Sequence, residues 1–200
     1  MTKAMVAVAQ TVAPDLEFEG WTSTKGPASI QGSEDGQRAT PPLLELVREA
    51  DRQRAQGIII GCFDDTALTQ AAKIAHCPVI GIGQASYHYA ALRSWRFSVV
   101  TTLPVSVPII ERNIQDFGFG SRVGQVRASG VPVLALEEDP ERSLKEIVGE
   151  AKRAEADDNV DAIVLGCAGM VNVTASVRGA VELGVIDPIE SAAAAMRWLI

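Results

Sequence analysis

The sequence has no run of basic residues and no long apolar stretch. Its 200 residues carry 25 Asp and Glu against 18 Lys and Arg, a formal net charge of −7. This acidic balance disfavours nucleic acid or an anionic membrane surface as the main partner. No segment approaches the roughly 18 uninterrupted apolar residues of a membrane helix. We therefore expect no nucleic-acid partner, no membrane partner and a small molecule as ligand.

Cysteine is scarce as well. The three cysteines have no C-x-x-C spacing, which suits neither a disulfide framework nor a zinc cluster. His76 beside Cys77 has no second pair of ligands, so we predict no metal. The apolar run 4–9 is short and preceded by a single lysine, unlike an export signal. These features favour a cytoplasmic protein with free thiols.

Apolar residues make up 47% of the chain, enough for a substantial core. Short apolar runs alternate with stretches of helical periodicity, and runs that are apolar throughout indicate strands buried on both faces of a parallel sheet. The pattern predicts a doubly wound α/β fold. The predicted strands are 16–21, 58–60, 79–82, 98–101, 131–135, 162–165 and 185–186. The predicted helices are 5–12, one opened by Pro41-Pro42 and ended by Gly57, 66–75, 84–94, 105–117 and 141–156, with a loop at 23–40.

The plan of the chain repeats. Gly61-Cys62 and Gly166-Cys167 lie 105 positions apart, and Val79-Ile80 and Val185-Ile186 lie 106 apart. We interpret this as an internal duplication. It predicts two pseudo-symmetric parallel-sheet lobes with an active site between them. Residues 1–94 plus 187–200 would form the lobe that carries Cys62, and 95–186 the lobe that carries Cys167.

The same register places the counterpart of the strand at 99–102 upstream of Met1. We therefore expect the first lobe to lack its first strand. Either Met1 is internal to a longer reading frame, or the lobe is built without that strand and is impaired.

Cys62 and Cys167 each follow a buried strand and a glycine, the position at which open α/β sheets bind ligands. Duplication would bring the two thiols face to face. A helix starting after each cysteine would favour the thiolate, so each could act as a base or, once protonated, as an acid. Two such groups on opposite faces of one carbon can invert it. The alternative is that both are ordinary buried cysteines that pack as small apolar residues.

Several motifs together resemble the aspartate/glutamate/hydantoin racemase superfamily, especially its hydantoin and allantoin racemase branch. They are Gly61-Cys62-Phe63-Asp64-Asp65, Val100-Thr101-Thr102, Val164-Leu165-Gly166-Cys167-Ala168-Gly169-Met170, Ile186-Asp187-Pro188 and the loop Gly26-Pro27-Ala28-Ser29-Ile30-Gln31-Gly32. The resemblance covers essentially the whole chain. It implies a racemase that needs no cofactor, with Cys62 and Cys167 as the catalytic pair around the stereocentre of a 5-substituted hydantoin or a ureido relative such as allantoin.

The resemblance also implies substrate contacts at the two cysteine turns and at the end of the strand 98–101. The predicted substrate-binding residues are Phe63, Asp64, Thr101, Thr102, Gly166, Ala168 and Gly169. Relatives of this family are usually homo-oligomers, and we expect one here. The two threonines could instead simply end a strand.

Other members of the superfamily provide the alternatives. Amino-acid racemases typically carry Asn-Thr after the first cysteine and Thr-His or Thr-Glu after the second, whereas this chain has Phe63-Asp64 and Ala168-Gly169, which suits a neutral ring better. Arylmalonate decarboxylases keep one catalytic cysteine and maleate isomerases keep two. A further alternative is a relative that binds a small molecule without turnover.

The two aspartates after Cys62 have different expected roles. A carboxylate next to Cys62 would oppose thiolate formation, so a substrate contact by Asp64 is left open. Asp is a preferred helix N-cap, and we predict that Asp65 caps a helix.

Overall fold

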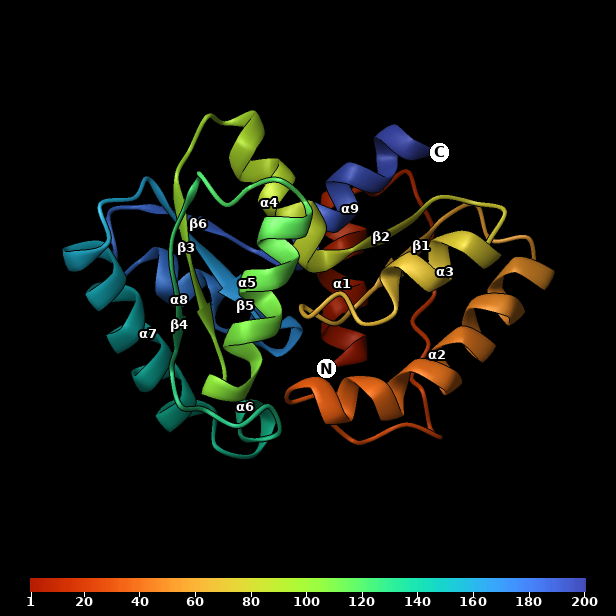
Figure 1. Ribbon diagram of the computed structural model, residues 1–200, viewed down its shortest axis with the longest axis horizontal. Helices are drawn as coiled ribbons and strands as arrows, with labels where there is room; N and C mark the ends of the chain where they lie inside the picture. Colours follow the sequence, from red (N-terminus) through yellow and green to blue (C-terminus); the bar gives the residue numbers. More distant parts are fainter.

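The computed structural model describes residues 1–200 and contains two separate parallel sheets (Figure 1). The strands are β1 (Ile58–Ile60), β2 (Val79–Gly81), β3 (Phe97–Thr101), β4 (Val123–Ala128), β5 (Ala162–Gly166) and β6 (Gly184–Ile186). The α-helices are α1 (Thr2–Val12), α2 (Ser33–Arg52), α3 (Leu68–Ile74), α4 (Ile82–Leu92), α5 (Val107–Asp116), α6 (Ala135–Glu138), α7 (Pro140–Asp157), α8 (Thr174–Arg178) and α9 (Pro188–Leu199). Two 3₁₀ turns, η1 (Pro104–Ser106) and η2 (Ala168–Asn172), complete the described elements.

The larger sheet has the order β4-β3-β5-β6. Every residue of β3 and β5 is buried, because side chains alternate between two covered faces. On one face Val99 and Val164 join a core with α4, α5 and α9, and on the other Val100 and Leu165 join a core with α7 and η2. The prediction of buried central strands is confirmed for both.

The smaller sheet consists of β1 and β2, with Ile59 opposite Ile80. One side is covered by α2 and α3, where Val47, Leu68 and Ala71 pack on Ile60. Helix α9 packs against α1 and α4 and also contacts β1, β2 and β5. In Figure 1, α1 and α9 stand between the two sheets. No helix of the structure is both long enough and apolar enough to span a bilayer.

Two predicted strands are wrong. Residues 16–21 contain no strand, because an alternating segment becomes a strand only beside a partner, and β1 and β2 pair with each other alone. Residues 131–135 form a turn that leads into α6, and Pro132 cannot donate to a ladder. The place predicted for a strand at 131–135 is taken by β4, which pairs with β3. Because β4 mixes glycine, glutamine and arginine with valine, its sequence does not show the alternation of apolar and polar residues that predicts a strand.

The predicted loop at 23–40 is also partly wrong. Helix α2 begins at Ser33, with Gly32 as its N-cap residue, and continues through Pro41 and Pro42. Each proline lacks a backbone N–H and is tolerated best in the first turn of a helix. The sequence Pro41-Pro42 therefore predicts a helix start, although the helix has already begun. The buried Ala39 and Val47 hold the helix on the rest of the fold on both sides of the prolines.

Candidate active site

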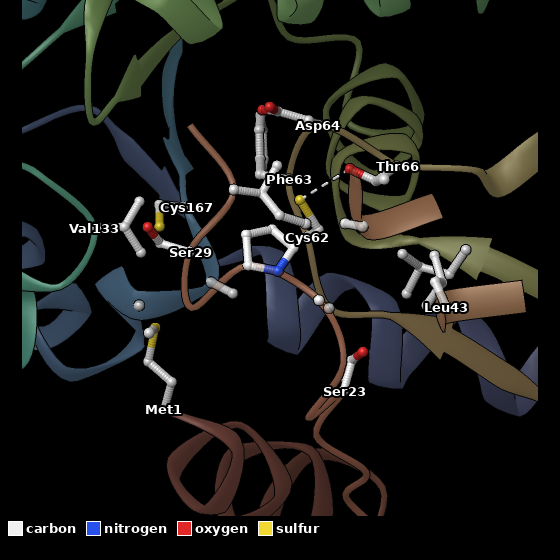
Figure 2. Close-up of a pocket in the computed structure, with 18 of the residues that line it drawn as sticks. Met1, Ser23, Ser29, Leu43, Cys62, Phe63, Asp64, Thr66, Val133 and Cys167 are labelled. Carbon is white, nitrogen blue, oxygen red and sulfur yellow. Dashed lines mark hydrogen bonds between the residues drawn. The ribbon is translucent and has the colours of Figure 1, made fainter. Parts of the chain in front are cut away.

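The two cysteines that follow β1 and β5 line one cavity of about 490 Å³ (Figure 2). Cys62 comes from the turn after the smaller sheet and Cys167 from the turn after the larger one. The carboxyl ends of the two sheets therefore face a common space, and the thiols are close enough for a charge on Cys167 to raise the pKa of Cys62. The two thiols therefore lie in one site, as the duplication predicts.

All nine residues predicted for the site line this cavity. They are Cys62, Phe63, Asp64, Thr101, Thr102, Gly166, Cys167, Ala168 and Gly169. Their roles in catalysis and binding stay predictions. Most of the remaining wall was not predicted for the site: it comes from the start of α1, the segment 21–30 and α2, with Met5, Pro27 and Leu43 among its apolar residues, and from single residues such as Thr66 and Val133. Nothing in local periodicity marks these residues, because tertiary packing alone brings them there.

Cys62 lies in an irregular turn and not directly before a helix, since α3 begins at Leu68. Burial raises the pKa of its thiol to about 12, and the charge of Asp64 adds to the effect. The hydroxyl of Thr66, 3.4 Å from Sγ, and the backbone N–H of Asp64 act in the opposite direction. The expectation that a helix N-terminus favours the Cys62 thiolate is therefore wrong.

Cys167 does precede a helical turn, but η2 is only five residues long. Burial raises the pKa of its thiol to about 11. The backbone N–H groups of Gly169 and Met170 donate toward this sulfur and lower the pKa, while the charge of Asp64 raises it. Both thiols are thus predominantly protonated at neutral pH, and a thiolate at either position is a stronger base than an exposed one.

Thr101 and Thr102 lie at the carboxyl end of β3. The Thr101 hydroxyl donates to the carbonyl oxygen of Gly166 at 2.9 Å, which fastens β3 to the residue before Cys167. Its oxygen keeps a lone pair for a ligand. Thr102 is also buried at the cavity wall.

Phe63 anchors the Cys62 turn in the core. Its ring packs edge to face against Tyr87, with the ring centroids 5.8 Å apart, and its side chain is buried. The aromatic ring therefore holds the backbone between Cys62 and Asp64 in place.

Asp65 is a helix cap, as predicted, but for a different helix. Its carboxylate accepts hydrogen bonds from the backbone N–H of Gly83 at 3.0 Å and of Gln84 at 2.7 Å, in the first turn of α4. A Cβ at Gly83 would lie 2.5 Å from the carbonyl oxygen of Phe63, and one at Gly81 would lie 1.9 Å from Asp65 Oδ1. The turn after Cys62 is therefore fastened to the helix after β2.

Asp64 is the one ionisable side chain, apart from the two thiols, that lines the cavity. Its Oδ2 atom is buried and has no hydrogen-bond partner. Burial raises the pKa of the carboxyl group to about 6. Its charge, when present, raises the pKa of both thiols, so Asp64 is electrostatically coupled to each of them.

The buried, unpartnered carboxylate should destabilise the fold at high pH. Because its pKa is raised in the folded state, its contribution to stability is fully present below pH about 4 and is lost as pH rises through about 6. Asp64→Asn should increase the free energy of unfolding by about 1–3 kcal/mol at pH 8, and by less at pH 5. Urea unfolding at both pH values measures this. Asp116→Asn, at the exposed end of α5, is the control, and an equal effect in both variants would contradict the interpretation.

Known proteins match the chain along most of its length. The Asp/Glu/Hydantoin racemase family matches residues 1–196. A hydantoin racemase from Rhizobium meliloti is 44% identical over 169 residues, which is 84% of this chain and 70% of that protein. The solved allantoin racemase from Klebsiella pneumoniae superposes with a TM-score of 0.93 at 33% identity, over 99% of this chain and 81% of that one.

A more distant solved structure shares the fold alone. The glutamate racemase from Francisella tularensis subsp. tularensis SCHU S4 superposes with a TM-score of 0.69 at 17% identity, over 98% of this chain and 76% of that one. The α/β arrangement with parallel sheets is therefore common to these proteins. From the match to residues 1–196 and the identity to the Rhizobium protein, the chain belongs to the Asp/Glu/Hydantoin racemase family.

Proposed function

We propose that the protein is a racemase that inverts the stereocentre of a 5-substituted hydantoin or of a ureido relative such as allantoin. The observation that carries this proposal is the pair of buried thiols, contributed by two different sheets, in one cavity. The family and its hydantoin and allantoin racemase relatives support it. The catalytic groups in this proposal are Cys62 and Cys167.

In the proposed reaction the thiolate of one cysteine removes the proton from C5, next to the ring carbonyl. The electron pair of the broken C–H bond moves into the carbonyl and produces a planar enolate. The thiol of the other cysteine then gives its proton to the opposite face, and its sulfur becomes the thiolate. For the other enantiomer the two cysteines exchange roles. The proposed proton transfers need no cofactor.

The enolate oxygen needs donors where its charge develops. Candidates on the cavity wall are the backbone N–H groups directly after the two cysteines, at Phe63 and Ala168, and the hydroxyl of Thr102. Desolvated donors of this kind stabilise a developing oxyanion strongly because no water competes with them.

The charge of the cavity wall favours a neutral ring over an amino acid. No lysine, arginine or histidine lines the cavity, and Asp64 is acidic. A carboxylate substrate would therefore have no side-chain cation to pair with on entering a buried site, a large cost in free energy. This supports a hydantoin-type substrate over aspartate or glutamate, and also over the dicarboxylates of arylmalonate decarboxylases and maleate isomerases.

We also place the cavity between two lobes, residues 1–94 plus 187–200 and residues 95–186. The positions of β1 and β2 in the first, and of β3 to β6 in the second, support this division. That the protein is a homo-oligomer stays a prediction.

A substrate panel tests the function. Single enantiomers of aromatic and aliphatic 5-substituted hydantoins, allantoin and aspartate are incubated with the protein, and loss of optical rotation is compared with a sample without protein. We expect racemisation of at least one hydantoin or of allantoin, and none of aspartate. Racemisation of aspartate alone would overturn the substrate assignment. Ligand binding without any exchange of the C5 proton with deuterated solvent would instead support a non-catalytic relative.

A further inference from the structure

The two sulfur atoms of the site receive hydrogen bonds of different kinds. At Cys167 the donors are backbone N–H groups, those of Gly169 and Met170. At Cys62 one partner is the backbone N–H of Asp64 and the other is a side chain, the hydroxyl of Thr66, whose Oγ1 lies 3.4 Å from Sγ (dashed line in Figure 2). The two turns therefore share a backbone donor two residues after the cysteine and differ in the second group, which is the Thr66 hydroxyl at Cys62 and the N–H of Met170 at Cys167.

The Thr66 hydroxyl is dedicated to this contact. It has no hydrogen-bond partner other than Cys62, and the residue is 8% exposed at the cavity wall. A hydroxyl can donate to a thiolate and accept from a thiol, so it serves Cys62 in both protonation states. Thr66 is therefore able to follow the sulfur through a cycle of proton uptake and release.

The backbone holds Thr66 in this position. Asp65 before it is hydrogen-bonded to α4, and the N–H of Leu68 after it donates to the carbonyl oxygen of Asp65 at 3.0 Å. The N–H of Asp65 in turn donates to the carbonyl oxygen of Cys62 at 3.0 Å. These bonds fix the turn that separates Cys62 from Thr66, so the hydroxyl needs little ordering to reach the sulfur.

We propose that Thr66 is a positioning residue for Cys62 alone, and that it stabilises the Cys62 thiolate in the half-reaction in which Cys62 removes the proton from C5. This inference rests on the proposed two-cysteine reaction and deepens it. Thr66 itself takes no part in breaking or forming the C5–H bond. When Cys62 is the base, its sulfur takes the C5 proton and the Thr66 hydroxyl changes from donor to acceptor.

The test separates the two half-reactions. In Cys167→Ser only Cys62 can remove a proton, and in Cys62→Ser only Cys167 can. Thr66→Val, which removes the hydroxyl and keeps the shape, is introduced into each of these variants. Exchange of the C5 proton with deuterated solvent is then measured for each enantiomer of a hydantoin that the wild-type protein racemises, and the uncatalysed rate is subtracted.

We expect Thr66→Val to slow the exchange by Cys62 roughly 10- to 100-fold, the effect of losing a hydrogen bond to a charged group. The exchange by Cys167, measured on the other enantiomer, should change less than about threefold on the same scale. Thr66→Ser in the Cys167→Ser background should restore most of the Cys62 rate, because the hydroxyl is present again. The Cys167 half-reaction also reports whether the Val variant is folded.

Equal slowing of both half-reactions would overturn the proposal, since it would show a general structural role. So would an unchanged Cys62 half-reaction, or a failure of Thr66→Ser to restore the rate. Failure of the underlying function looks different: neither single-cysteine variant would then exchange the C5 proton, and the wild-type protein would not racemise the hydantoin.

Discussion

Replacing Cys62 or Cys167 by serine should abolish most racemisation while leaving each variant able to exchange the C5 proton of one enantiomer. Inversion requires a base on one face of the carbon and an acid on the other, and both thiols line the same cavity. A serine hydroxyl ionises far above the pKa of a thiol, so it neither removes nor donates the proton effectively. Loss of one acid–base partner typically costs roughly 10²- to 10⁴-fold in rate.

The two variants should be complementary. The enantiomer that Cys62→Ser exchanges with deuterated solvent should be the one that Cys167→Ser does not. Proton NMR of the C5 position measures exchange, and optical rotation measures inversion in the same sample. Racemisation at the wild-type rate in either variant would contradict the two-thiol reaction.

The third cysteine provides a matched control. Cys77 does not line the cavity and lies just before β2. Cys77→Ser makes the same chemical change outside the site, so we expect racemisation within a factor of about two of wild type. A large loss in this variant would show that the serine substitutions act through folding.

The second large effect concerns stability. Arg127→Met should lower the free energy of unfolding by about 3–5 kcal/mol at pH 7, the typical result of removing one partner of a buried ion pair. Arg127, on β4, donates from both Nε and one terminal nitrogen to the carboxylate of Asp158, and from the other nitrogen to Glu150 Oε1 at 3.1 Å. The side chain of Asp158 is 0% exposed, so the substitution leaves its charge buried without a cation.

The pH dependence of this loss identifies its cause. Burial alone would raise the pKa of Asp158, but the hydrogen bonds from Arg127 and Ser98 outweigh it, so the pKa lies below its usual value. The stability contributed by the pair is present above pH about 4 and fades as pH falls further. The difference between wild type and Arg127→Met in urea unfolding should therefore shrink at low pH.

Arg153→Met is the matched control for this experiment. Arg153 also pairs with Glu150, but its side chain is 58% exposed, and exposed pairs contribute about 0–1 kcal/mol. A loss as large as that of Arg127→Met would mean that the charge of Glu150, and not the buried Asp158, dominates.

The sequence predicts the central strands and the two cysteine turns well, because their signals are local. Ile58–Ile60 and the strand before Gly166 are apolar throughout, a pattern typical of strands in a parallel sheet. The second is buried along its whole length, whereas Ile58 and Ile59 are half-buried. The repeated Gly-Cys pair marks both turns, since the same residues stand at the same place in each half. The predicted bounds of helices α4 and α7 lie within a few residues of the observed bounds, because helical periodicity is also a local signal.

The remaining features depend on contacts that no local pattern encodes. The segment 16–21 alternates like a strand but has no partner. Asp65 follows the preference of its residue type and caps a helix, yet that helix begins 17 residues later in the chain. The raised pKa of both thiols follows from their burial, and the cavity that they share is lined in part by α2 and the segment 21–30, which lie far from Cys167 in sequence.

The difference between the donors at the two cysteines also limits how the protein can change by point mutation. Substitution alters side chains but leaves backbone N–H groups in place, except where proline is introduced. The surroundings of the Cys62 sulfur are therefore open to adjustment through residue 66, whereas both groups that donate to the Cys167 sulfur are backbone N–H groups, which a change of side chain does not remove. A point mutation can therefore change the hydrogen bonding of the Cys62 sulfur more readily than that of the Cys167 sulfur.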